Sequence, residues 1–142
     1  MHDLNVRRAA RNDDVLIAAL AGELGYPATA DEMRSRLDAL PATEAVFVAV
    51  DPNVIAWIQI GITVALESGA FAEIRGLVVN EAHRSRGIGA VLVAAAEEWA
   101  SAQGMVRMRV RSNVVRERTH RFYERLGYVV KKSQKSFEKR LD

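Results

Sequence analysis

The sequence predicts a single domain with an α/β fold. It is of the α+β kind, in which helices cover the faces of a mixed sheet. Segments that alternate apolar and polar side chains are interspersed with segments of helical spacing. Turn residues separate these segments, and no linker, repeat or low-complexity stretch interrupts the chain. The 142 residues suit one domain over 1–142 with a sizeable core. The expected order of elements is β-α-α-β-β-β-α-β-α-β-β.

The first third of the chain predicts one strand and two helices. Residues 4–9 alternate in the manner of a strand. The apolar residues that follow recur at helical spacing until Gly25, a residue type that commonly ends helices. A second helical pattern opens at Thr29 or Asp31, both suitable N-caps, and ends at Pro41.

The middle of the chain predicts three strands. Residues 45–50 and 54–63 are rich in β-forming side chains and flank a turn, as in a hairpin. The next strand, 71–79, ends in an apolar triplet that indicates burial on both faces. This triplet is Leu77, Val78 and Val79.

The last third predicts a helix, a strand, a helix and two short strands. Residues 89–100 have a helical packing stripe, and 105–111 alternate between apolar side chains and arginines. A further helix runs to Leu126, and 128–130 and 136–138 are the final strands.

The composition narrows the possible chemistry. The chain has no cysteine, which excludes disulfides, thiolate metal ligands and a cysteine nucleophile. No apolar run approaches the roughly 20 residues of a membrane span, and the N-terminus lacks the apolar stretch of a signal peptide. We therefore expect a cytoplasmic protein with no membrane partner. The net charge is only +2, but arginines concentrate from Arg84 onward, where they serve an anionic ligand or a solvated surface.

A glycine-rich turn between a strand and a helix is the main functional signal. It consists of Arg84, Ser85, Arg86, Gly87, Ile88, Gly89 and Ala90. A helix N-terminus presents unpaired N–H groups with partial positive charge, and glycines let a phosphate approach the backbone. The two arginines add charge for the same anion. The turn therefore predicts a diphosphate site, with a plain turn before a helix as the alternative.

Two other phosphate-binding motifs do not match this turn. A dinucleotide fingerprint needs a third glycine three residues after Gly89, where the chain has Leu92. A Walker A loop needs a Gly-Lys pair, and the sequence contains none. The turn therefore matches neither of these two motifs.

A second element lies toward the C-terminus. It is the run Phe122, Tyr123, Glu124, Arg125, Leu126, Gly127 and Tyr128. Phe122 and Leu126 are four residues apart and are expected to be core anchors of a helix. Tyr123 lies about 100° further round the helix, so we expect it to point away from that core face. An amphipathic packing role is the alternative for Tyr123.

In this order and at this spacing, the two elements resemble the GNAT superfamily (Gcn5-related) of N-acetyltransferases. Its acetyl-CoA motif is Gln/Arg-x-x-Gly-x-Gly/Ala, which residues 84–89 match, and its later motif ends in Phe-Tyr-x-x-x-Gly-Phe/Tyr, which 122–128 match. The expected order of elements also agrees with that family. Where the later motif often has asparagine and alanine, this chain has Arg116 and Thr119, and the nearest asparagine for the cofactor arm is Asn113.

The resemblance implies acetyl-CoA as the co-substrate and no metal. The diphosphate would lie in the turn 84–90. The pantetheine arm would pair with the backbone of Leu77, Val78 and Val79, where this strand splays from the next. A backbone N–H there would polarise the acetyl carbonyl.

The resemblance also implies that the acceptor amine attacks the acetyl group directly and that Tyr123 protonates the departing thiolate. The proton of the amine needs a base or a water path. Glu73 is the best candidate, because it precedes the buried triplet on the central strand, where alternation would place it on one face with Arg75, Leu77 and Val79. An ion pair of Glu73 with Arg75 or with a cross-strand partner is the alternative.

The predicted function is therefore acetyl transfer from acetyl-CoA to a primary amine of a small-molecule acceptor. The resemblance implies an acceptor site built by 23–40 and 66–71, and it allows a homodimer. One alternative is a non-catalytic acyl-CoA-binding sensor or partner module of the same fold, and another is a different enzyme that binds CoA or a nucleotide diphosphate. Aromatic residues are few and no recognition motif is present, so we expect no nucleic-acid partner.

Overall fold

The structure is a computed structural model that describes residues 4–111 and 117–142. The chain divides into two compact units, Met1–Val110 and Arg111–Asp142. A single domain over 1–142 remains a prediction.

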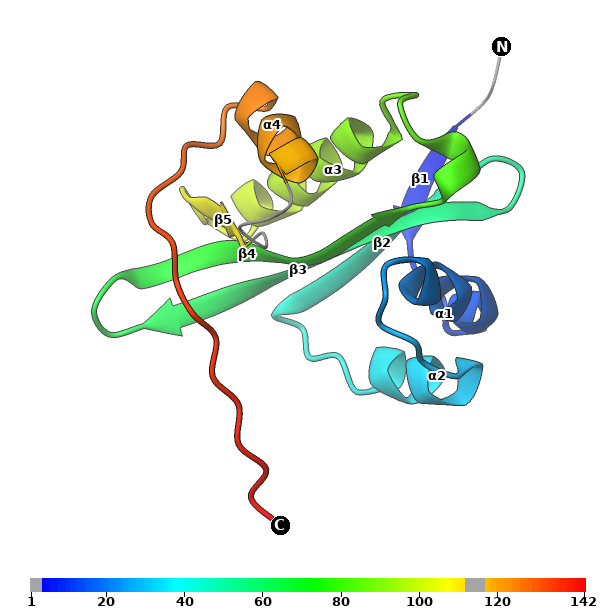
Figure 1. The fold of residues 1–142 in the computed structure, drawn as a ribbon, viewed down its shortest axis with the longest axis horizontal. Helices are drawn as coiled ribbons and strands as arrows, with labels where there is room; N and C mark the ends of the chain where they lie inside the picture. Colours follow the sequence, from blue (N-terminus) through cyan, green and yellow to red (C-terminus); the bar gives the residue numbers. More distant parts are fainter. Residues whose placement is uncertain (1–3, 112–116) are drawn as a thin grey trace. The chain divides into compact units, whose positions relative to one another are not determined.

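The first unit contains a five-stranded sheet with the spatial order β1-β2-β3-β4-β5 (Figure 1). Its strands are β1 (Asn5–Arg8), β2 (Glu44–Val50), β3 (Val54–Ala65), β4 (Gly69–Val79) and β5 (Met108–Val110). Neighbours from β1 to β4 are antiparallel, whereas β5 pairs with β4 in parallel. A parallel pair needs a crossover connection, and the helix that follows β4 supplies it. The predicted mixed sheet is confirmed.

The helices also follow the predicted order. They are α1 (Asp14–Glu23), α2 (Ala30–Asp38), α3 (Ile88–Ala102) and α4 (Glu117–Arg125), with short 3-10 helices η1 (Arg11–Asp13) and η2 (Glu81–His83) before α1 and α3. Gly25 and Gly104 follow α1 and α3 with φ of 96° and 84°. This left-handed conformation ends helices and favours glycine, which explains both stops.

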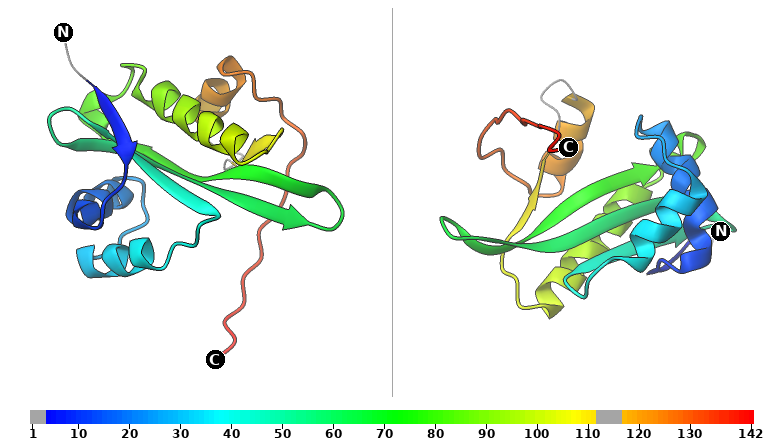
Figure 2. Two further views of the ribbon diagram at one scale, coloured as in Figure 1. Left: turned by 180° about the vertical axis from the view of Figure 1, so that it is seen from behind. Right: turned by 90° about the horizontal axis from the view of Figure 1, so that it is seen from below.

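Different helices cover the two faces of the sheet, with α1 and α2 on one side and α3 on the other (Figure 2). Ile17 and Leu20 of α1 form a buried cluster with Val48 of β2 and Val78 of β4. α3 packs against β2, β3 and β4. The centre of the sheet is thus buried on both faces, which holds β4 and the start of α3 in fixed positions within this unit.

A β-bulge at Arg75 divides β4 into two segments. Gln59 of β3 pairs with Gly76, but the next residue of β3, Ile60, pairs with Ile74. Arg75 is therefore the extra residue, and the alternation of side chains shifts by one position there.

The bulge overturns the expectation that Glu73 shares a face with Leu77 and Val79. Glu73 pairs with Gly61, and Val78 pairs with a residue four positions earlier on β3. Cross-strand partners share a face, so Glu73 lies on the face of Val78, which α1 covers in part. Leu77 and Val79 point to the opposite face. Alternation counted along the sequence gave the wrong face because it cannot detect an inserted residue.

Strand β5 is shorter than the predicted range 105–111. The N–H of Met105 donates to the carbonyl of Ala100 at 3.0 Å, so this residue completes the C-terminal turn of α3. Only Met108–Val110 pair with β4 as a strand.

The second unit has α4 and, within its described residues 117–142, no strand. The two predicted final strands, 128–130 and 136–138, are therefore wrong. Val129, Val130 and Phe137 have β-forming side chains, but all three are exposed. β-Propensity depends on packing against cross-strand neighbours, and these residues have no paired strand in the described part of the unit.

Candidate active site

The glycine-rich turn is an exposed loop that leads into α3. Arg84, Ser85, Arg86 and Gly87 are all exposed. Ser85 and Gly87 have φ of 67° and 79°, the left-handed region that favours glycine. A Cβ at Gly87 would have no atom within 4 Å, so the conformation, and not crowding, accounts for this glycine. The space beside the loop is open to a ligand.

The first turn of α3 offers unpaired N–H groups. The first bond within the helix runs from the N–H of Val91 to the carbonyl of Gly87 at 3.1 Å. The N–H groups of Ile88, Gly89 and Ala90 therefore have no acceptor inside the helix. The side chain of Ile88 is 5% exposed and anchors this turn in the core, so Ile88 can offer a ligand only its backbone.

The N-terminus of α2 has a capping box, which the N-terminus of α3 lacks. At α2, the Thr29 hydroxyl accepts from the N–H of Glu32, and the Glu32 carboxylate accepts from the N–H of Thr29, both at 3.0 Å. Among the described residues, no side chain caps α3 in this way and none in its first turn is acidic. Exposed Arg84 and Arg86 lie beside it instead. A positive helix end with two arginines and no competing carboxylate suits a diphosphate.

Among the described residues, the strand that leads to this loop has no partner along the edge beyond Ile74. β4 and β5 pair at three positions, the last of which joins Ile74 to Val110. Leu77 and Val79 lie beyond this pairing. The N–H of Asn80 donates toward β3, to Ile55 at 2.8 Å, and alternation then directs the N–H groups of Leu77 and Val79 away from β3. These groups can pair with an extended ligand arm. The splay of the two strands stays a prediction.

The apolar triplet of β4 is less buried than expected. Val78 is buried in the α1 cluster, but Leu77 and Val79 are only half-buried. The Nε of Arg84 lies 3.4 Å from the carbonyl of Val79 and links the exposed loop to the end of this strand. Leu77 and Val79 are therefore accessible in part at the end of β4 that leads into the loop.

Glu73 is a buried carboxylate, 7% exposed, on a strand paired on both sides. Its Oε1 accepts from Nη1 of Arg75 at 2.6 Å. The ion pair that the sequence left as an alternative is therefore present. A positioned carboxylate on a largely apolar sheet can serve as a general base if an amine reaches it.

Tyr123 lies on α4, in the second unit, and is 7% exposed. Its ring lies edge-on to those of Phe122 and Tyr128, with centroids 5.0 and 5.6 Å away. Burial raises the pKa of Tyr123 to about 12. The expectation that Phe122 and Leu126 are buried and Tyr123 points away is wrong, because Phe122 and Leu126 are only half-buried. The ring contacts explain why the aromatic side chain packs inward.

Two further points concern the predicted site residues. Asn113 lies outside the residues that the structure describes. The sequence reasoning also missed Glu44 and Thr63, which both interact with Arg75. A charged residue in the middle of an apolar strand, as Arg75 is, was the available signal that such partners exist.

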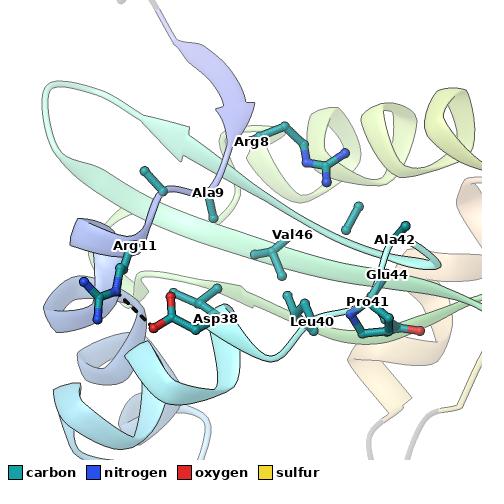
Figure 3. A pocket seen from close by; sticks show the side chains of 12 residues that line it. Arg8, Ala9, Arg11, Asp38, Leu40, Pro41, Ala42, Glu44 and Val46 are labelled. Atoms are coloured by element: carbon teal, nitrogen blue, oxygen red, sulfur yellow. Dashed lines mark hydrogen bonds and ion pairs between the residues drawn. The ribbon is translucent and has the colours of Figure 1, made fainter.

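A polar cavity of about 260 Å³ lies in the first unit, and Glu44, which also contacts Arg75, is one of its lining residues (Figure 3). It is bounded by the chain around β1 and η1, the end of α2 and the start of β2. An ion pair between Nε of Arg11 and Asp38 at 3.0 Å lies on its wall. The cavity meets the segment expected to bind the acceptor only at 37–40, and it includes none of the predicted catalytic or cofactor residues.

A sequence model of the Acetyltransferase (GNAT) family matches residues 11–128, and the chain belongs to this family. It is therefore an N-acetyltransferase by class. Comparison with curated protein sequences gave no match.

Solved structures support the same fold. An acetyltransferase from Trypanosoma brucei matches with a TM-score of 0.82 and 23% identity, over 96% of this chain and 99% of that one. Glucosamine-6-phosphate N-acetyltransferase from Arabidopsis thaliana matches with a TM-score of 0.80 and 20% identity, over 98% and 99%. An aminoglycoside 6′-N-acetyltransferase from Acinetobacter haemolyticus matches with a TM-score of 0.79 and 19% identity, over 97% and 99%.

Two other features of the described residues bear on function. None of their helices is long and apolar enough to cross a membrane. They also contain no group of three or more His, Asp or Glu side chains placed to hold a metal ion.

Proposed function

We propose that this protein transfers an acetyl group from acetyl-CoA to a primary amine of a small molecule. The observation that carries this proposal is the open N-terminus of α3, with three unpaired N–H groups beside Arg84 and Arg86. A CoA diphosphate has the charge and size for such a site.

The proposed cofactor site continues from the loop onto β4. The loop residues bind the diphosphate through the backbone of Gly87 to Ala90 and through the two arginines. The pantetheine arm pairs with the outward backbone groups of Leu77 and Val79. One of these N–H groups polarises the acetyl carbonyl.

The proposed chemistry balances as a direct transfer. The nitrogen of the amine bonds to the acetyl carbon while the bond from that carbon to sulfur breaks. Glu73 takes the proton of the amine, directly or through water, and Tyr123 gives a proton to the CoA thiolate. No covalent bond to the protein forms at any stage.

The proposal of a small-molecule acceptor is supported by two structural neighbours whose names describe acetylation of an aminoglycoside and of glucosamine 6-phosphate. Both acceptors are polar small amines. A sheet face with the Glu73 carboxylate suits an amine, because the cationic form is attracted to the carboxylate before it loses its proton.

Calorimetry with CoA tests the cofactor site first. We expect saturable binding that free adenosine 3′,5′-diphosphate weakens by competition. A ligand at 100 times its Kd adds about 2.7 kcal/mol to the free energy of unfolding, so CoA should also raise Tm. No heat and no thermal shift at millimolar CoA would contradict the proposal.

Thiol release from acetyl-CoA tests turnover. The panel should contain kanamycin, glucosamine 6-phosphate, spermidine, free amino acids and a peptide with a free N-terminus. Release that depends on one of the small amines is expected. Saturable CoA binding without release from any member would favour the non-catalytic sensor, and release with the peptide alone would replace the small-molecule acceptor by a protein terminus.

A further inference from the structure

A polar cluster surrounds Glu73 on the sheet face that α1 covers in part. Its members come from three strands and are Glu44, Gln59, Thr63, Glu73 and Arg75. Glu44 pairs with Gly61, and Gly61 pairs with Glu73, so the two carboxylates lie in one row across β2, β3 and β4. A single general base does not need so many polar neighbours, so the cluster calls for an explanation of its own.

Arg75 is the centre of this cluster, and all of its donors are engaged. Nε and Nη2 donate to the two oxygens of Glu44 at 3.3 and 3.0 Å. Nη1 donates to Thr63 Oγ1 at 2.8 Å and to Glu73 Oε1 at 2.6 Å, and Nη2 also reaches the carbonyl of Ile62 at 3.5 Å. A guanidinium has five N–H groups, and these five contacts use each of them. Arg75 is therefore fixed in place and has no donor left for an anionic acceptor.

Arg75 follows Glu73 by two positions on β4, so ordinary alternation places the two side chains on the same face. The bulge shifts the alternation only after Arg75, which has no cross-strand partner on β3. The carboxylate of Glu44 clamps the guanidinium from the other side in the two-point geometry that orients both groups. Contact with Glu44 also raises the pKa of Arg75 above its usual value, through the side-chain hydrogen bond first.

Gly61 makes room for the clamp. A Cβ built on Gly61 would lie 1.8 Å from Oε2 of Glu44, so the carboxylate occupies the space that any other residue would fill. Gln59 holds the same carboxylate through Nε2 to Oε1 at 2.9 Å. The glycine is therefore required by a side chain and not by its backbone conformation.

From these contacts we propose that Arg75 is a positioning residue that orients the Glu73 carboxylate toward the acceptor amine, and that Glu44, seated over Gly61, holds Arg75 in place. This inference rests on the proposed role of Glu73. It assigns the whole cluster to the orientation of one reacting carboxylate, and it excludes Arg75 as a binding group for the acceptor.

A double-mutant cycle tests whether Arg75 acts through Glu73. The measured rate is thiol release from acetyl-CoA. The acceptor is the amine of the panel described above that gives the highest kcat/KM. Arg75→Met should lower kcat about 10-fold or more, because small displacements of a reacting group have large effects, while the Kd of CoA stays unchanged. In a Glu73→Gln background, Arg75→Met should cause no further loss of kcat. Additive losses in the double variant would overturn the proposal, as would full kcat in Glu73→Gln alone.

A second variant covers the case in which Arg75→Met does not fold. Gly61→Ala displaces only the flexible end of Glu44, so the protein should fold and kcat should fall in the same way. Gly22→Ala is the matched control, since a Cβ there meets no atom within 4 Å, and its kcat should equal that of the wild type.

Crystal structures give a result that does not depend on turnover. The Glu73 carboxylate of Gly61→Ala should be rotated from its wild-type position, and an unmoved carboxylate would overturn the proposal even if no acceptor is found. Failure of the proposed function is a separate result, because it consists of absent CoA binding or absent thiol release in the wild-type protein.

Discussion

Tyr123 combines a packed ring with a hydroxyl that burial keeps protonated. The raised pKa, about 12, means that the phenol is neutral at every pH well below that value. A neutral phenol can donate a proton, and the ring contacts to Phe122 and Tyr128 fix its direction on α4. The same residue can therefore serve packing and catalysis, and only the hydroxyl separates the two roles.

Tyr123→Phe separates these roles, because it keeps the ring and removes the hydroxyl. If Tyr123 is the general acid, kcat should fall by about 10²–10⁴-fold while Tm and the Kd of acetyl-CoA hardly change. Steady-state thiol release with calorimetry measures all three. Tyr128→Phe is the matched control and should keep its kcat.

Two outcomes would count against the assignment of Tyr123. Full kcat in Tyr123→Phe on the best acceptor would refute it. Parallel losses of Tm and of CoA affinity, without a specific loss of kcat, would leave Tyr123 with a packing role alone.

At the scale of elements, the start of α3 was predictable because its signal is local. Glycine, arginine and the switch from strand to helix follow one another within a few residues. Equally local chemistry marks the end of α1 at Gly25 and the start of α2 at Thr29. Local sequence alone therefore locates this turn, without any tertiary contact.

Features that depend on pairing between distant strands were not predictable in the same way. The bulge at Arg75 follows from the register of β3 against β4, and it reversed the face assigned to Leu77 and Val79. The clamp of Glu44 on Arg75 joins residues 31 positions apart. The prediction of two final strands was wrong for the same reason, because β-forming side chains such as Phe137 do not specify a partner strand.

Gly89→Val tests the open end of α3. A branched side chain in the first turn would enter the space proposed for the diphosphate, so the Kd of CoA should rise more than about 10-fold, or roughly 1.4 kcal/mol. Calorimetry measures this directly. Gly22→Val is the matched control, because it also places valine in a helix and carries a similar helix-propensity cost, at a position where a Cβ meets no atom within 4 Å. Unchanged affinity in folded Gly89→Val would mean that the phosphates bind elsewhere.

At the scale of the whole molecule, the family match over 11–128 includes parts of both compact units. Within the first unit, two buried carboxylates connect neighbouring elements. Asp13 binds Arg7 of β1 with Oδ2 2.8 Å from Nη1, and Asp14 binds Arg34 of α2 with Oδ2 2.7 Å from Nε. These pairs hold β1, α1 and α2 together around the sheet face that carries Glu73.

The two pairs predict that the protein loses stability in acid. Hydrogen bonding from Arg7 lowers the pKa of Asp13, and hydrogen bonding from Arg34 lowers that of Asp14. A carboxyl group whose pKa is lower in the folded state stabilises that state above its unfolded pKa of about 3.9, and this contribution is lost as the pH falls through the folded value. Urea midpoints should therefore stay level from neutral pH to about pH 5 and then fall steeply. Asp13→Asn and Asp14→Asn should each lower the neutral plateau and flatten the acid slope. Asp31→Asn is the control, because the Asp31 side chain is 93% exposed and its ion pair with Arg34 at 3.5 Å lies at the surface, where such pairs contribute little. An acid slope as steep in both variants as in the wild type would assign the acid sensitivity to other carboxylates.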